Sequence, residues 1–149
     1  MTTELPWSEP QHVDDEAWHR VLEVPCAHRG CPDGALVVNL MTTTDGPVPP
    51  TTARLVEDVV AALPDVLDTA LDLLVATARA QPRVVGLDAA YAVTPDGLGD
   101  LSLVVDESDE WLVHVGECPF PAADPYGIAV RMRGVVPVAL ETLDDAEEL

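Results

Sequence analysis

The chain has 149 residues and a mass of 15.9 kDa, which corresponds to one domain of ordinary size. It contains 27 Asp and Glu residues against seven cations, all of them Arg, so its formal net charge is −20. Because phosphate contacts require Lys and Arg, this balance argues against binding to nucleic acid or to an anionic membrane surface. A basic protein is the expected kind of partner.

The N-terminal third of the sequence alternates polar segments with short apolar ones. Residues 1–16 are polar and contain Pro, and we expect them to form a loose N-terminal arm. Residues 18–24 and 35–43 are typical of strands, because each is rich in apolar and β-branched side chains and is followed by Pro or Gly. A single α+β domain is predicted for residues 17–149.

The clearest helical pattern covers about residues 51–79, where apolar side chains recur every three or four positions. Pro64 lies inside this stretch and removes a backbone amide, so it either kinks one helix or begins a second. Carboxylates occupy the polar side of the pattern, where they are predicted to contact cations of a partner. These carboxylates are Glu57, Asp58, Asp65, Asp68 and Asp72.

The remainder of the chain is predicted to be mostly strands separated by Pro-, Gly- and Asp-containing turns. The expected strands are 84–93, 101–105, 110–115, 127–132 and 135–140, with a tight turn at Arg133 and Gly134. Within residues 110–115, Trp111, Val113 and Val115 share one face. The predicted fold class is therefore α+β, with an antiparallel or mixed sheet of about five to seven strands packed against the kinked or split helix.

The cysteines suggest a cytoplasmic protein. They number three, and an odd number argues against a secreted disulfide framework, so reduced thiols are expected. The sequence contains no stretch of ~18 apolar residues that would span a membrane. The main interpretation requires no cofactor. In an alternative interpretation, thiolates and imidazoles from two clusters bind zinc. The ligands would then be Cys26, His28, Cys31 and Cys118.

Several short motifs carry a family resemblance that covers residues 18–140. They are Trp18 followed by Val-Pro25-Cys26, Pro-Pro-Thr at 49–51, Val-Leu-Asp-x-Ala-Leu at 66–71, Trp111-x-Val-His-Val-Gly-x-Cys118 and Asp124-Pro-Tyr-Gly-Ile-Ala-Val130. In this order they resemble small uncharacterised actinobacterial α+β domains, which are similar in character to toxin-immunity proteins. The resemblance implies a binding role and supplies no catalytic residues.

The sequence therefore predicts a non-enzymatic, cytosolic protein-binding domain. Its most concrete form is an immunity-type inhibitor that occludes a basic toxin or nuclease with its acidic surface. No Ser lies in a Gly-x-Ser-x-Gly motif, and no glycine-rich phosphate loop is present. A small zinc-binding or thiol-dependent regulatory module is one alternative. An acidic secretion chaperone or adaptor, which would form a stable homodimer, is another, and the sequence leaves the oligomeric state open.

Overall fold

The fold is a mixed seven-stranded sheet with two helices, as the α+β prediction required. The computed structural model describes residues 7–14, 17–28, 31, 34–86, 98–117, 120 and 127–142. The helices are α1 (Pro50–Ala61) and α2 (Leu63–Ala80), followed by the short 3-10 helix η2 (Pro82–Val85). The strands are β1 (Gln11–Asp14), β2 (Ala17–Pro25), β3 (Ala35–Thr42), β4 (Gly99–Val105), β5 (Glu110–Glu117), β6 (Ile128–Arg133) and β7 (Val136–Thr142).

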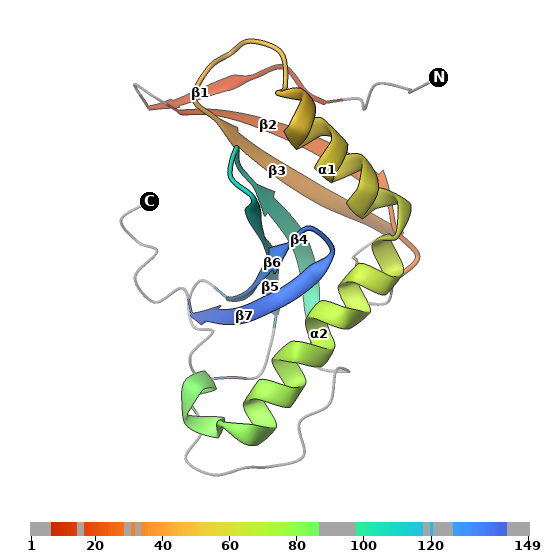
Figure 1. The fold of residues 1–149 in the computed structure, drawn as a ribbon, viewed down its shortest axis with the longest axis vertical. Helices are drawn as coiled ribbons and strands as arrows, with labels where there is room; N and C mark the ends of the chain where they lie inside the picture. Colours follow the sequence, from red (N-terminus) through yellow and green to blue (C-terminus); the bar gives the residue numbers. More distant parts are fainter. Residues whose placement is uncertain are drawn as a thin grey trace.

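The order of the strands in the sheet is the order of the chain, β1 to β7. Neighbouring strands are antiparallel except β3 and β4, which are parallel. The long connection that a parallel pair requires contains α1 and α2. Figure 1 shows α1 lying along β2 and β3, and α2 continuing past β7, with which it makes contacts. The two helices therefore connect strands β1–β3 to strands β4–β7 in the chain.

The hydrophobic core lies between the helices and one face of the sheet. A single row of apolar side chains crosses six strands there, because the register places these residues opposite one another. The row consists of Leu22, Val38, Leu103, Val113, Val130 and Leu140. In β5, Trp111 and Val115 are buried on this face while Leu112 and His114 are half-buried on the other, as the alternation of the sequence predicted.

The helical segment is split in two, which decides between the two alternatives for Pro64. α1 ends at Ala61, and α2 begins at Leu63, so Pro64 lies in the first turn of α2. Amides in the first turn of a helix have no carbonyl partner within that helix, so the amide that Pro lacks is not needed. The amide of Val66 donates the next bond to the carbonyl of Ala62 at 3.0 Å.

Two segments differ from the sequence-based expectation. Val84 and Val85 belong to η2 rather than to the strand predicted over 84–93, and residues 87–93 lie outside the described part of the chain. Pro82 at the start of η2 cannot donate to a sheet ladder, and Val85 is instead fully buried in the core. At the N-terminus, the arm expected over residues 1–16 contains β1, which pairs with β2. No helix of the described residues is long and apolar enough to cross a membrane.

Candidate functional site

The carboxylates predicted to bind a partner lie on the outer sides of α1 and α2, and we call this set the acidic helical face. Its members are Glu57, Asp58, Asp65, Asp68 and Asp72. Glu57 is half-buried and the other four are exposed, because the apolar positions of both helices are directed at the core. The sequence pattern therefore placed these side chains on the solvent side, which is the first requirement for contact with a partner.

The break between the helices divides the acidic helical face into two parts. Glu57 and Asp58 belong to α1 and precede the break, whereas the three aspartates belong to α2. Asp65, Asp68 and Asp72 are spaced by three and four residues, so they lie on the same side of one helix. The three α2 aspartates therefore form one row along a single helix. Glu57 and Asp58 lie on α1 and do not belong to that row.

Asp68 differs from its neighbours because it contacts a buried histidine. Its Oδ1 lies 2.7 Å from Nε2 of His28, which follows β2 in the chain. The His28 side chain is 5% exposed and that of Asp68 is 61% exposed, so the contact joins the core to the surface. Asp68 therefore also has a structural role, since it attaches the loop after β2 to α2. No motif indicates this pair, because its members are 40 residues apart in the chain.

The loop between β2 and β3 brings Cys26 and Cys31 together. Both thiols are free and buried, at 5% and 8% exposure. The amide of Cys26 donates to the carbonyl of Gly34 at 2.8 Å, and that of Cys31 to the carbonyl of His28 at 3.0 Å. Burial raises the pKa of the Cys31 thiol to about 12, and a hydrogen bond and an electrostatic interaction with the Cys26 side chain add to this effect. Cys31 therefore keeps its proton at neutral pH.

The fourth residue of the possible zinc site, Cys118, lies outside the described residues. Among those that are described, no group of three or more His, Cys, Asp and Glu side chains is arranged to hold a metal ion. β2 and β5 end at the same edge of the sheet, with β3 and β4 between them. Three strand spacings, or about 14 Å, therefore separate Pro25 from the last residues of β5. A zinc site that includes Cys118 requires the segment after β5 to return across two strands.

A groove of about 380 Å³ lies where the first turn of α1 meets the turns that follow β4 and β6. Thr51, Thr52 and Leu55 line it from the helix, and Ser108, Asp109 and Arg133 are among the residues on the other side. Two smaller hollows, of about 340 and 220 Å³, flank the same β4–β5 turn. The sequence predicted only a turn between two strands here, because the groove arises from segments far apart in the chain.

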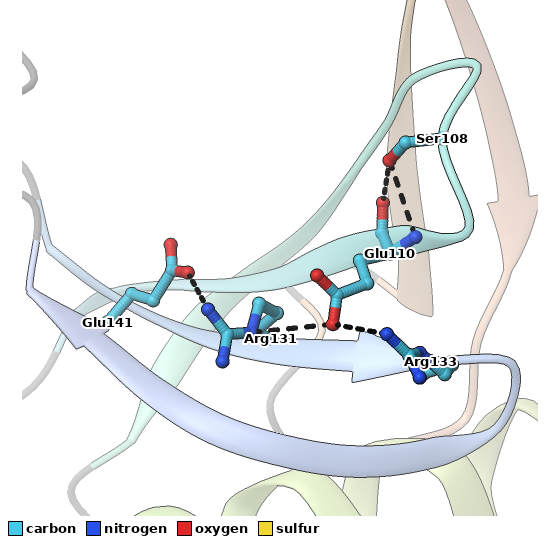
Figure 2. A network of polar contacts seen from close by, with 5 residues as sticks. All are labelled: Ser108, Glu110, Arg131, Arg133 and Glu141. Atoms are coloured by element: carbon cyan, nitrogen blue, oxygen red, sulfur yellow. Dashed lines mark hydrogen bonds and ion pairs between the residues drawn. The ribbon is translucent and has the colours of Figure 1, made fainter.

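A network of ion pairs neutralises charge on the sheet face opposite the helices. Figure 2 shows Glu110 between two arginines of β6. Its Oε2 lies 3.6 Å from Nε of Arg131 and 3.4 Å from Nη2 of Arg133, and Arg131 also reaches Oε1 of Glu141 at 3.1 Å. Ser108 supports Glu110 by donating its hydroxyl to the Glu110 carbonyl at 2.8 Å. The positive charges of two arginines are thus paired with the negative charges of two glutamates on this face.

Comparisons of the chain with protein-family models, with curated proteins and with solved structures find no match.

Proposed function

We propose that this chain is a non-enzymatic protein-binding domain that presents its acidic helical face to a basic partner. The observation that carries the proposal is the exposure of four of its five carboxylates on the solvent side of the two helices. By contrast, the arginines of β6 are paired with carboxylates of their own sheet face. The unbalanced negative charge is thus available on the helices, where only Arg54 and Arg79 offset it.

The proposed mechanism is occlusion. Carboxylates of the acidic helical face pair with cations that the partner uses for its own substrate, as an immunity-type inhibitor of a basic toxin or nuclease would do. Each exposed ion pair contributes only about 0.2–1 kcal/mol, so the surface acts mainly by accelerating encounter and excluding wrong partners. Such binding weakens as salt concentration rises, because exposed charges are screened.

Charge-matched variants test whether this particular surface binds. In the first variant, Asp58, Asp65 and Asp72 are replaced by Asn, and Asp68 is kept because it also contacts His28. In the control variant, Glu9 and Glu23 are replaced by Gln and Asp109 by Asn, which changes the net charge equally at exposed positions elsewhere. Both variants and the parent chain are tested by biolayer interferometry against a panel of purified basic ribonucleases, with inhibition of RNA cleavage measured in parallel.

The parent chain is expected to bind and inhibit at least one basic ribonuclease of the panel. Neutralising three pairs of about 0.5 kcal/mol each predicts an affinity about tenfold weaker for the helix variant. The control variant should lose much less. Equal losses for the two variants would show that only total charge matters, and binding that does not weaken with salt would contradict an electrostatic interface. If the parent chain binds none of the ribonucleases, the proposed partner class is wrong.

A zinc-binding regulatory module is the second candidate, and the contact between Cys26 and Cys31 favours it. The two thiols form a close-spaced pair in one short loop, as zinc ligands often do, and the site would take its other two ligands from His28 and Cys118. The test is the metal content of the full chain after purification without chelator. One zinc ion per chain, lost in the Cys118→Ser variant, would support the four-ligand site. Substoichiometric zinc in the parent chain would contradict it.

A further inference from the structure

The helices pack against one face of the sheet, and no helix of the described residues covers the other. On that second face the register places six side chains in a row across β2 to β7. All six are half-buried, whereas Leu22 and Val113 of the core row are completely buried. We call this surface the open sheet face and define it by the row and by Val37, which is 37% exposed. The row consists of Val21, Asn39, Val104, Leu112, Arg131 and Ala139.

The centre of the open sheet face is apolar and hollowed. Val104 of β4 and Leu112 of β5 lie directly opposite each other in the register. Both line the hollow of about 220 Å³ beside the β4–β5 turn, together with Arg131. A partner that enters this hollow removes two apolar side chains from water, which is the main source of favourable free energy in most interfaces.

The charges in the middle of the open sheet face are paired with one another. Arg131 lies 3.6 Å from Glu110 and 3.1 Å from Glu141, and Arg133 lies 3.4 Å from Glu110 (Figure 2). Glu23, at the β2 margin of the face, is exposed. Two arginines and two glutamates thus leave the centre of this face without net charge, although the chain as a whole carries −20.

We propose that the open sheet face binds a second copy of this chain, so that the protein is a homodimer with its two sheets packed face to face. Charge determines the occupant. Two copies that each carry −20 repel one another where their acidic surfaces meet, so a neutral surface is where they can associate. A basic partner gains no attraction from a neutral face and is drawn instead to the acidic helical face. Contact of one face with the same face of a second copy is also the commonest arrangement in homodimers.

The open sheet face is large enough for such an interface. Five strand spacings separate β2 from β7, which is about 24 Å, and three outward positions along each strand cover about 20 Å. The flat area is therefore about 500 Å², and the accessible area is larger because side chains project from the sheet. A standard interface buries about 800 Å² of accessible surface per partner, so the face has the size that a stable dimer needs.

This interface goes beyond the proposed function and does not depend on it, because the acidic helical face lies on the other side of the sheet. A dimer would carry two acidic helical faces, one on each outer side. Salt separates the two proposals. Rising salt weakens binding to a basic partner, whereas it strengthens the dimer, because the repulsion between two acidic copies is screened and the apolar contact remains.

Sedimentation equilibrium of the full, reduced chain tests the proposal. The parent chain is expected to be a dimer whose Kd falls as salt is raised from about 50 mM to about 500 mM. Leu112→Glu and Val37→Glu each place a charge in the interface twice per dimer, and each should raise the Kd about 30-fold or more. Ala76→Glu adds the same charge at an exposed position of α2 and should change the Kd by less than about threefold.

Circular dichroism establishes that each variant is folded before its Kd is compared. If Leu112→Glu does not fold, Val37→Glu decides the outcome, because the Val37 side chain is already 37% exposed. A parent chain that stays monomeric at concentrations up to about 1 mM would overturn the proposal. A dimer that Val37→Glu leaves intact, that Ala76→Glu weakens equally, or that salt dissociates would overturn it as well.

Discussion

Replacing Gly127 by Ala should destabilise the fold far more than the same change at Gly134. Both glycines have positive φ, at +85° and +60°. They differ in surroundings. A Cβ on Gly127 would lie 2.5 Å from the carbonyl oxygen of Val115 and 2.8 Å from Nε2 of His114, whereas a Cβ on Gly134 would meet no heavy atom within 4 Å. Gly134→Ala therefore measures the free-energy cost of the backbone conformation alone. Gly127→Ala measures that cost together with the cost of the steric clash.

The magnitudes follow from these two costs. Ala in the left-handed region costs about 1–2 kcal/mol, and the loss of chain freedom in the unfolded state offsets about 0.4–1 kcal/mol of it. Gly134→Ala should therefore cost about 1 kcal/mol. At Gly127, the carbonyl of Val115 belongs to β5, which pairs with β6, so it cannot move away freely. Overpacking of this kind adds about 1–3 kcal/mol, which brings the total to about 2–4 kcal/mol.

Urea and thermal unfolding, followed by circular dichroism, measure the difference. In a domain of this size, 1 kcal/mol corresponds to about 2–4 °C, so the melting temperature should fall by about 3 °C for Gly134→Ala and by about 10 °C for Gly127→Ala. Equal losses in the two variants would refute the reasoning, because they would show that the close approach of Gly127 to β5 has no energetic consequence.

Three further predictions concern the core, the helix break and the thiol pair. Trp111→Phe should lower the free energy of unfolding by about 1–3 kcal/mol, because the buried indole N–H donates to the carbonyl of Gly134 at 2.8 Å; urea denaturation measures this, and no loss would contradict it. Pro64→Ala should change that free energy by less than about 1 kcal/mol, whereas Pro at Thr69, inside α2, should cost about 3 kcal/mol or more, and similar effects would contradict the split helix. The pKa of Cys31 rises from 9.0 to about 12 on folding, so its stabilising effect is complete below pH 9 and is lost between pH 9 and pH 12; Cys31→Ser should flatten the decline in stability measured over that range, and an unchanged decline would contradict it.

Elements with a strong local pattern were predictable from the sequence. The alternation in β5 identified its buried face, and the missing amide of Pro64 located the helix break near its true position. The tight connection between β6 and β7 was equally local, since Gly134 supplies a positive φ and Arg133 pairs with Val136. In each case a few neighbouring residues determine the outcome.

Features that depend on distant segments were not predictable. The parallel pairing of β3 with β4 is determined by where the two helices return the chain, and no residue of either strand encodes it. η2 was missed because the apolar run after Pro82 is compatible with both a strand and a buried turn. In the candidate site, the polar side of the helices was predictable from spacing. The contact of Asp68 with His28 and the groove beside α1 require the tertiary structure.

The strand order has a consequence for how the chain reaches its native state. Five of the six neighbouring strand pairs are antiparallel and join strands that follow one another in the chain, so hairpins such as β6–β7 close short loops and lose little chain entropy on forming. The pairing of β3 with β4 is the exception, because the whole of residues 43–98 must be arranged before those strands can meet. We therefore expect two meanders to assemble early and the zipping of β3 onto β4 to limit the folding rate.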